Sequence, residues 1–274
     1  TTERWRSPAH DKTILHIDSD PMVPGANYNT AASVIADAGL ALEALVDIIK
    51  GKDIDGIDFD GKARAADAWA KKLADFNPLA QSNQRPITPE AVIHHLSAQL
   101  DNDGIVVADP GTPCPYVSAH YRWPQAGRHF ITNRAHGALG FGMAAAMGAH
   151  IGRPSVKTVA LMGDGSFGFC CGEFETMTRY RMPITSIVFS NATYGWIKAG
   201  QKTGFGERYH NVDFNRTDHA AVASAFGVKS WRVEDPAELP RVMRQALDHD
   251  GPTLIDVISQ PLHEAAAPVS EWVA

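Results

Sequence analysis

One carboxylate and one amide in this chain are spaced so that together they could hold a divalent cation on a phosphate group. Asp164 lies in a Gly-Asp-Gly turn directly after the apolar run at residues 158–162, and Asn191 follows the apolar, β-branched run at residues 184–189. Such runs are typical of buried parallel strands, whose carboxyl ends meet at one edge of a sheet. We therefore expect Asp164 and Asn191 to meet at that edge.

These two side chains would make half of a magnesium site. Mg²⁺ prefers about six oxygen ligands and usually takes some of them from a bound phosphate. Gly165 lets backbone N–H groups approach that phosphate, and a helix that begins near Ser166 would point the positive end of its dipole at it. Residues 167–180 have helix-compatible spacing, and Pro183 ends that pattern. The predicted chemistry is a diphosphate held through a divalent cation.

The Gly-Asp-Gly turn, the spacer and the later Asn-x-x-Tyr-Gly resemble the signature of thiamine diphosphate (ThDP) enzymes, most closely their acetolactate-synthase-like branch. The resemblance implies that Asp164 and Asn191 bind Mg²⁺ through their side chains and Thr193 through its backbone carbonyl. Many members have Asn-Asn where this chain has Ser190-Asn191, and the second Asn is the ligand. A bare Gly-Asp-Gly also suits an ordinary strand-to-helix turn, but its strand, helix and strand context favours the ThDP interpretation.

Two further segments resemble cofactor-binding motifs of the same family. Residues 109–113 follow a predicted strand at 104–108 and would lie against the diphosphate, with a plain Pro/Gly turn as an equal alternative. In the small-residue segment 133–146, the Gly137 carbonyl would accept from the 4′-amino group of ThDP, and Leu139 would bend the cofactor. The residues that the resemblance assigns to the cofactor are Gly111, Thr112, Gly137, Ala138, Leu139, Gly163, Asp164, Gly165, Ser166, Asn191, Tyr194 and Gly195.

The sequence assigns no catalytic residue. His136 is a candidate acid–base group, with a core histidine or a helix cap as the alternative. The resemblance places Trp196 and Gln201 beside the substrate, although a core tryptophan is an equal interpretation. It also implies a catalytic Glu on a separate pyrimidine-binding domain, which nothing before Thr13 could form. Glu173 is interpreted as structural.

The activity that the resemblance implies is that of a ThDP- and Mg²⁺-dependent 2-oxoacid decarboxylase or carboligase, which breaks or forms C–C bonds next to a carbonyl. We expect this chain to be the diphosphate-binding subunit. A second subunit would bring the pyrimidine-binding domain and its Glu, in an oligomer such as a dimer of heterodimers. A fragment of a longer enzyme is the competing explanation. The alternatives are a 2-hydroxyacyl-CoA lyase, a flavin-linked 2-oxoacid oxidase, whose FAD this chain does not support, and a non-catalytic ThDP-binding homologue.

The elements that must position these residues form an open, mostly parallel α/β sheet with helices on both faces. Thr88 is the expected N-cap of a helix whose first residue is Pro89, and Asp235 the expected N-cap of another. Residues 204–213 resemble a mobile active-site loop. Further strands are predicted at residues 130–132, 228–233 and 252–258, further helices at 62–76 and 218–226, and a connector at 78–86.

The N-terminal part resembles the end of a Rossmann-like middle domain, with one strand at residues 13–17 and one helix at 30–49. A lone strand and helix cannot bury their own faces. The acidic stretch at residues 51–61 lacks the closing Glu of an EF-hand and is expected to be a solvated linker. The expected divisions are a middle-domain remnant at 1–50, a linker and helix at 51–87, the diphosphate- and Mg²⁺-binding domain at 88–262 and a tail at 263–274.

The composition fits a globular protein with a substantial core: 274 residues, 44% hydrophobic and 20% charged. A net charge of −6 and the lack of a basic stripe argue against a nucleic-acid partner. The sequence shows neither a signal peptide nor a membrane-spanning run, so a cytoplasmic location is expected. Cys114, Cys170 and Cys171 have no metal-binding spacing and are expected to be buried thiols, with a reactive thiolate at a helix N-terminus as the alternative.

Overall fold

The computed structural model describes residues 8–52, 60–133 and 135–265. The chain divides into two compact units, residues 1–69 and 70–272, and this division falls within helix α2 (Gly61–Ala80). The domain limits expected at residues 50, 87 and 262 stay predictions. Most of the acidic linker expected at residues 51–61 lies outside the described residues.

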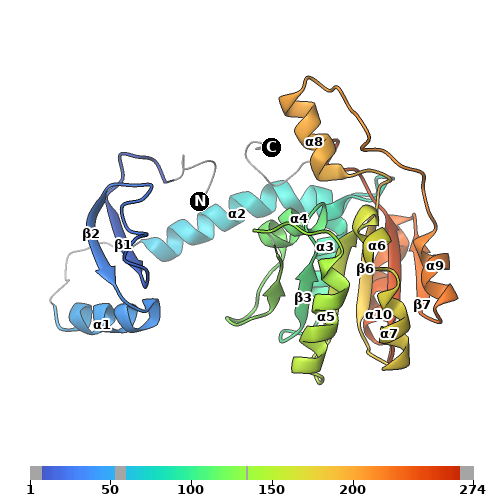
Figure 1. Ribbon diagram of the computed structural model, residues 1–274, viewed down its shortest axis with the longest axis horizontal. Coiled ribbons are helices and arrows are strands. Elements are labelled where there is room, and N and C mark those ends of the chain that lie inside the picture. Colours follow the sequence, from blue (N-terminus) through green and yellow to red (C-terminus); the bar gives the residue numbers. More distant parts are fainter. Residues whose placement is uncertain (1–7, 53–59, 134, 266–274) are drawn as a thin grey trace. The chain divides into compact units, whose positions relative to one another are not determined.

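A wholly parallel sheet of six strands organises the second unit, in the order β4-β3-β5-β6-β8-β7 (Figure 1). The strands are β3 (Ile105–Ala108), β4 (Phe130–Ile131), β5 (Thr158–Gly163), β6 (Thr185–Ser190), β7 (Lys229–Val233) and β8 (Thr253–Ile258). The open parallel sheet predicted from the sequence is therefore confirmed, and each strand lies within a residue or two of its predicted place.

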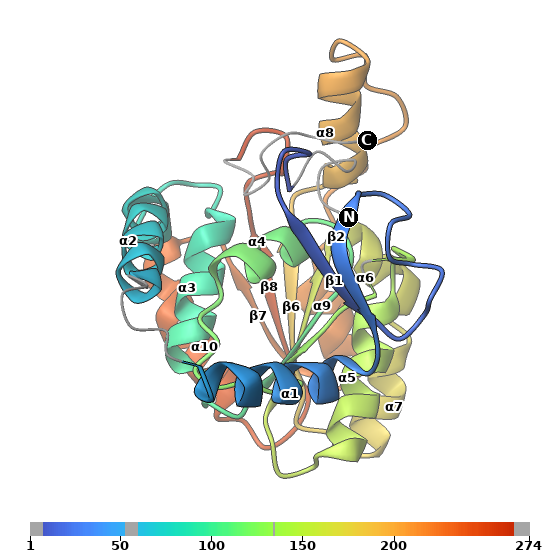
Figure 2. The same ribbon diagram turned by 90° about the vertical axis from the view of Figure 1, so that its left-hand side faces the viewer.

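Helices cover both faces of this sheet, and Figure 2 shows α3 and α10 on one side with α5 and α7 on the other. The first face carries α3 (Pro89–Gln99), α4 (Pro113–His120) and α10 (Leu239–Leu247), and the second α5 (Phe141–Gly152), α6 (Asp164–Cys170), α7 (Glu173–Arg179) and α9 (His219–Ala225). In β5, Val159 and Leu161 pack into the first apolar cluster, whereas Ala160 and Met162 pack into the second. Because both faces are buried, the strands have continuous apolar sequences.

The strand order reverses between β3 and β5. From β3 the chain passes outward to β4 and then returns to β5 on the other side of β3. The loops that leave β3 and β5 therefore diverge at the carboxyl edge of the sheet. In open α/β sheets, ligands bind in the crevice at such a switch point.

The first unit contains a parallel pair of strands, β1 (Ile14–Asp18) and β2 (Thr30–Ile35), followed by helix α1 (Ala38–Lys50). The helix predicted over residues 30–49 is therefore wrong in its first third, which is a strand. Pairing with β1 outweighs the helix-compatible spacing there, and spacing alone does not contain that contact. The helix begins after Asp37, whose side chain accepts from the Leu40 N–H at 3.1 Å.

Two other helix predictions need correction, and two helices were not predicted. The helix expected over residues 167–180 is two short helices, α6 and α7, which separate at Cys171-Gly172, where glycine disfavours a helix interior. The cysteine pair therefore lies at the end of α6 and not at a helix start. Helix α2 continues through Pro78 to Ala80, into the expected connector. Helices α4 and α8 (Gly195–Gly204) were not predicted.

Replacing Thr88 with Ala is expected to lower the free energy of unfolding by about 1–2 kcal/mol. As predicted, Thr88 caps α3: its Oγ1 accepts from the Ala91 N–H at 3.4 Å and donates to the Leu79 carbonyl at 2.7 Å. Denaturant unfolding measures the change. Thr88→Ser keeps the hydroxyl and is the control, so an equal loss in both variants would contradict this explanation.

Candidate functional site

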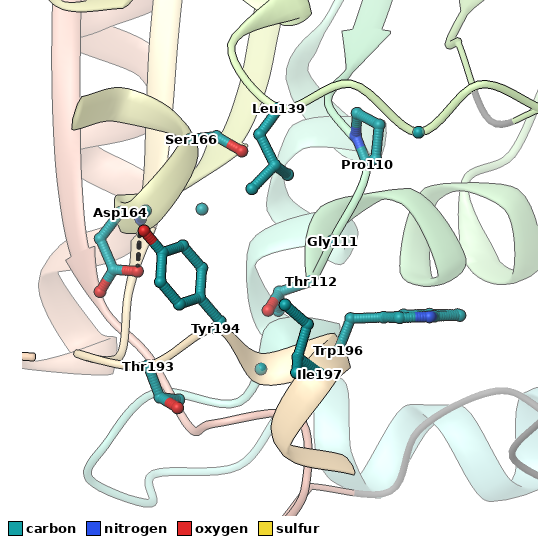
Figure 3. Close-up of a pocket in the computed structure, with 14 residues that line it drawn as sticks. Pro110, Gly111, Thr112, Leu139, Asp164, Ser166, Thr193, Tyr194, Trp196 and Ile197 are labelled. Carbon is teal, nitrogen blue, oxygen red and sulfur yellow. Dashed lines mark hydrogen bonds between the residues drawn. The ribbon is translucent and has the colours of Figure 1, made fainter. Parts of the chain in front are cut away.

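A cavity of about 340 Å³ opens at the carboxyl edge of the sheet, at the β3/β5 switch point. Figure 3 shows Leu139 and Ile197 directed into the same open space from opposite sides. Loops that follow four strands line the cavity: residues 110–112 after β3, Gly137 and Leu139 after β4, residues 163–166 after β5 and residues 193–197 after β6. A cavity of this volume is in the range typical of small-molecule sites.

The carboxylate of Asp164 joins the loops after β5 and β6. Its Oδ2 accepts from the N–H groups of Asn191 at 2.7 Å and Ala192 at 2.6 Å, and its Oδ1 accepts from the Gly165 N–H at 2.9 Å. The expected meeting of Asp164 and Asn191 is confirmed, through the backbone of Asn191. Asp164 is also the first residue of α6, so the helix begins two residues before the predicted start near Ser166.

Burial raises the pKa of the Asp164 carboxyl group above its usual range, while the three N–H donors and the nearby His219 act in the opposite direction. A carboxylate has about four lone-pair positions, of which three are used here. One position therefore stays available for a cation, and a cation bound there would favour the ionised form of this buried group.

The side chain of Asn191 ties the β6 loop to the β3 loop. Its Nδ2 donates to Thr112 Oγ1 at 3.4 Å, and its Oδ1 accepts from the Thr193 N–H at 3.3 Å. Thr193 lines the cavity, whereas Asn191, which is 7% exposed, lies behind the lining residues. The magnesium-binding roles expected for these residues stay predictions.

Residues 192–194 are joined to residues 212–214 by a short antiparallel bridge. The backbone hydrogen bonds run from the Tyr194 N–H to the Val212 carbonyl at 2.8 Å and from the Phe214 N–H to the Ala192 carbonyl at 3.0 Å. The Thr193 hydroxyl also donates to the Val212 carbonyl at 2.8 Å. The loop that contains Thr193 is thus fixed to a second segment of the chain.

Several predicted site residues lie outside the described lining of the cavity. Gln201 instead bonds to the backbone of His210, as donor to its carbonyl at 3.2 Å and acceptor from its N–H at 3.0 Å. Ala138 and His136 are exposed and are not among the lining residues. Trp196 lines the cavity and also packs against the core, and its expected place beside the substrate stays a prediction.

Sequence reasoning missed Asp109, which is fully buried directly after β3. Its Oδ2 accepts from the N–H groups of Gly140 and Gly142, both at 3.2 Å. Its Oδ1 has no hydrogen-bond partner among the described residues. Burial raises the pKa of Asp109 to about 6, against the effect of these N–H donors. The signal in the sequence was an acidic residue at the carboxyl end of a buried strand.

Replacing Asp109 with Asn is expected to remove part of the dependence of stability on pH. The folded carboxyl group has a pKa of about 6 against an ordinary value of 3.8, so between these values the folded state holds more protons than the unfolded chain. The contribution of Asp109 to stability is therefore full below the lower value and falls by about 3 kcal/mol as pH rises through the higher one.

Denaturant unfolding across this pH range measures that contribution. The difference in unfolding free energy, wild type minus Asp109→Asn, should decrease as pH rises. A difference that is independent of pH would contradict the buried-carboxyl explanation.

The thiol of Cys170 is buried, and this burial raises its pKa to about 12. Its Sγ donates to the Ser166 carbonyl at 3.4 Å. Since the thiolate is the reactive form, these facts favour the buried-thiol interpretation over a reactive cysteine.

No group of three or more His, Cys, Asp or Glu side chains within the described part of the chain could hold a metal ion by itself. A cation beside Asp164 would therefore need oxygens from a ligand or from water, which is what a Mg²⁺–diphosphate half-site requires. The residues present fit such a group, because the cavity lining combines one carboxylate that has a free lone-pair position, Asp164, with the hydroxyl-bearing residues Ser166 and Thr193. Across the same described ranges, every helix is too short or too polar to traverse a lipid bilayer.

A family profile described as "Thiamine pyrophosphate enzyme, C-terminal TPP binding domain" matches residues 110–257. Thiamine pyrophosphate is another name for ThDP. The chain is 29% identical, over 93% of its length, to a probable acetolactate synthase large subunit of Methanococcus aeolicus and covers 44% of that protein. It is 30% identical over 89% of its length to the acetolactate synthase large subunit of Parasynechococcus marenigrum, of which it covers 39%. A putative thiamine pyrophosphate-containing protein of Bacillus subtilis, YdaP, is 26% identical over 90% of this chain. The chain thus spans about two-fifths of the length of these relatives.

Proposed function

Because this chain belongs to the thiamine pyrophosphate enzymes, through their C-terminal TPP-binding domain, we propose that its cavity holds the diphosphate end of ThDP together with Mg²⁺. The observation that carries this proposal is the pair of hydrogen bonds that Asp164 accepts from the backbone N–H groups of Asn191 and Ala192 at the switch point of the sheet. It brings the only acidic side chain among the described cavity-lining residues to the place where a diphosphate would lie.

In this proposal, each cavity-lining segment contributes different groups to the site. Asp164, Asn191 and the Thr193 carbonyl would bind the cation, while Ser166 would offer its backbone N–H to a phosphate oxygen, and Gly165, whose own N–H is held by Asp164, lets the phosphate approach closely. Leu139 and Ile197 form apolar parts of the cavity wall on opposite sides. Bound ThDP would supply the nucleophile and the electron sink that C–C chemistry next to a carbonyl requires.

The reaction class we propose is that of an acetolactate-synthase-like decarboxylase or carboligase on 2-oxoacids. Two of the relatives described above carry the acetolactate synthase name, which supports this class over a 2-hydroxyacyl-CoA lyase or a flavin-linked oxidase. The described residues that line the cavity include no Glu, so the activating Glu and the pyrimidine-binding half would come from outside them. We propose a second polypeptide as their source, with a further part of a longer chain as the alternative.

Titration with ThDP and Mg²⁺, followed by tryptophan fluorescence, tests the binding part of the proposal, because Trp196 lines the cavity. We expect quenching that needs Mg²⁺ and is reversed by a chelator; Trp196→Phe identifies its source. Quenching without turnover of pyruvate and acceptor 2-oxoacids would favour the non-catalytic homologue. Mass analysis of the active enzyme tests the partner: activity from this polypeptide alone would contradict a second subunit.

A further inference from the structure

We infer that Asp109 is a positioning residue, which clamps the loop between β4 and α5 so that Gly137 and Leu139 face the cavity. This inference rests on the proposed function, because the ligand in that cavity is taken to be ThDP. Asp109 itself is not among the described residues that line the cavity, so it acts through the loop and not on the ligand.

The clamp consists of one carboxylate oxygen and two backbone N–H groups. Oδ2 of Asp109 accepts from Gly140 and Gly142, which are the cap and the second residue of α5. These N–H groups belong to the first turn of a helix, where the backbone has no partner of its own and favours a negative charge. Asp109 thus caps α5 from a different strand, 31 and 33 residues away in the chain.

The position of Asp109 connects two of the loops that form the cavity. Its backbone N–H donates to the Leu161 carbonyl at 2.8 Å, which fixes it to β5, and the next residues, 110–112, line the cavity. On the other side of the clamp, Leu139 lines the cavity immediately before Gly140. A shift of the carboxylate would therefore move Leu139 relative to residues 110–112.

Packing around the clamp is close at both glycines. A Cβ added to Gly142 would lie 3.3 Å from Asp109 Oδ2, so the carboxylate would have to move by a few tenths of an ångström. Gly140 has a φ of +86°, and a Cβ there would lie 2.9 Å from the Cβ of Phe169. Side chains larger than glycine at these two positions would therefore disturb the clamp.

The clamp can be separated from general stability by comparing two ligands. Inorganic pyrophosphate with Mg²⁺ would use the loops around Asp164 and the backbone of residues 111–112, whereas ThDP would also need the loop that contains Leu139. For Asp109→Ala in the full chain, in the assembly in which it is isolated, we expect ThDP affinity to fall about tenfold or more, the effect of losing a hydrogen bond to a charged group. Pyrophosphate affinity should stay within about threefold of wild type, because the hydrogen bonds of Asp164 to the backbone of Gly165, Asn191 and Ala192 are unchanged.

Two further variants keep the test decisive if Asp109→Ala does not fold. Asp109→Asn retains an oxygen that can accept both N–H groups, so we expect ThDP affinity within about fivefold of wild type. Gly142→Ala keeps Asp109 but displaces its carboxylate, and it should reproduce the selective loss of ThDP affinity. Gly148→Ala is its matched control in the same helix, since a Cβ there meets nothing within 4 Å, and it should bind both ligands as wild type does.

The outcomes separate this inference from the proposed function. Wild type that binds neither ThDP nor pyrophosphate would overturn the proposed function. If wild type binds both, an equal loss of the two ligands in Asp109→Ala and Gly142→Ala, or no loss in either variant, would overturn the clamp. Asn at position 109 that binds ThDP as weakly as Ala would overturn it as well.

Discussion

Replacing Asp164 with Asn is expected to weaken Mg²⁺-dependent ThDP binding by about a hundredfold or more, the largest effect that we predict for any substitution. Two effects add in this variant. The charge that would face the cation is lost, and the amide NH₂ replaces an oxygen that accepts backbone N–H groups from Gly165 or from Asn191 and Ala192. An N–H group left facing another donor in a buried site has no compensating partner.

Fluorescence titration with ThDP at saturating Mg²⁺ measures this loss, and denaturant unfolding measures stability in parallel. Asp248→Asn is the control, because Asp248 is 63% exposed and pairs only at 3.8 Å with Arg244. Exposed pairs of this kind contribute little, so the control should bind as wild type does. Unchanged ThDP affinity in folded Asp164→Asn would remove the basis of the magnesium assignment.

Replacing Gly165 with Ala is expected to reduce ThDP affinity by about tenfold or more and the free energy of unfolding by about 1–3 kcal/mol. A Cβ at this position would lie 2.6 Å from Cε1 and 2.9 Å from Cδ1 of Tyr194. Movement of the ring would disturb its edge-to-face contact with Phe214, in which the ring centroids are 5.1 Å apart. Since Tyr194 forms part of the cavity wall, the clash changes the cavity as well as the packing.

Gly168→Ala is the matched control for this substitution. Gly168 lies in the same helix, one turn on, and a Cβ there meets nothing within 4 Å. Alanine is the better helix former, so this variant should be as stable as wild type or slightly more stable. If the two alanine variants lost stability and ThDP affinity equally, the contact with Tyr194 would not be the cause.

The sequence predicted the second unit better than the first because of how each unit is buried. Strands such as β5 and β6 are covered on both faces, so their apolar composition is visible in the sequence itself. Strand β2 is recognised only by its pairing with β1, a contact between segments that the local pattern does not encode. The same applies to α6 and α7, whose separation at Gly172 is a local break within one continuous helical pattern.

The sequence predicted those site residues that belong to a recognisable motif. Asp164, Thr193 and Tyr194 belong to recognisable turns at strand ends, and the structure brings them to one cavity. Asp109 could not be assigned a role, because its function depends on two N–H groups more than thirty residues away. Gln201 was predicted from a motif, but its hydrogen bonds depend on where the chain returns at His210. The magnesium and substrate roles of these residues stay predictions.

The bridge between residues 192–194 and 212–214 fixes both ends of the segment that lies between them. Lengthening a flexible loop whose ends are fixed costs only loop-closure entropy, about 0.6 kcal/mol for each doubling of the loop length. Insertions or exchanged segments between residues 205 and 209, which are exposed and follow α8, should therefore leave the Thr193 carbonyl where it is. A library of grafts confined to these residues would let a protein engineer vary this surface loop while the cavity-lining residues 193–197 stay in place.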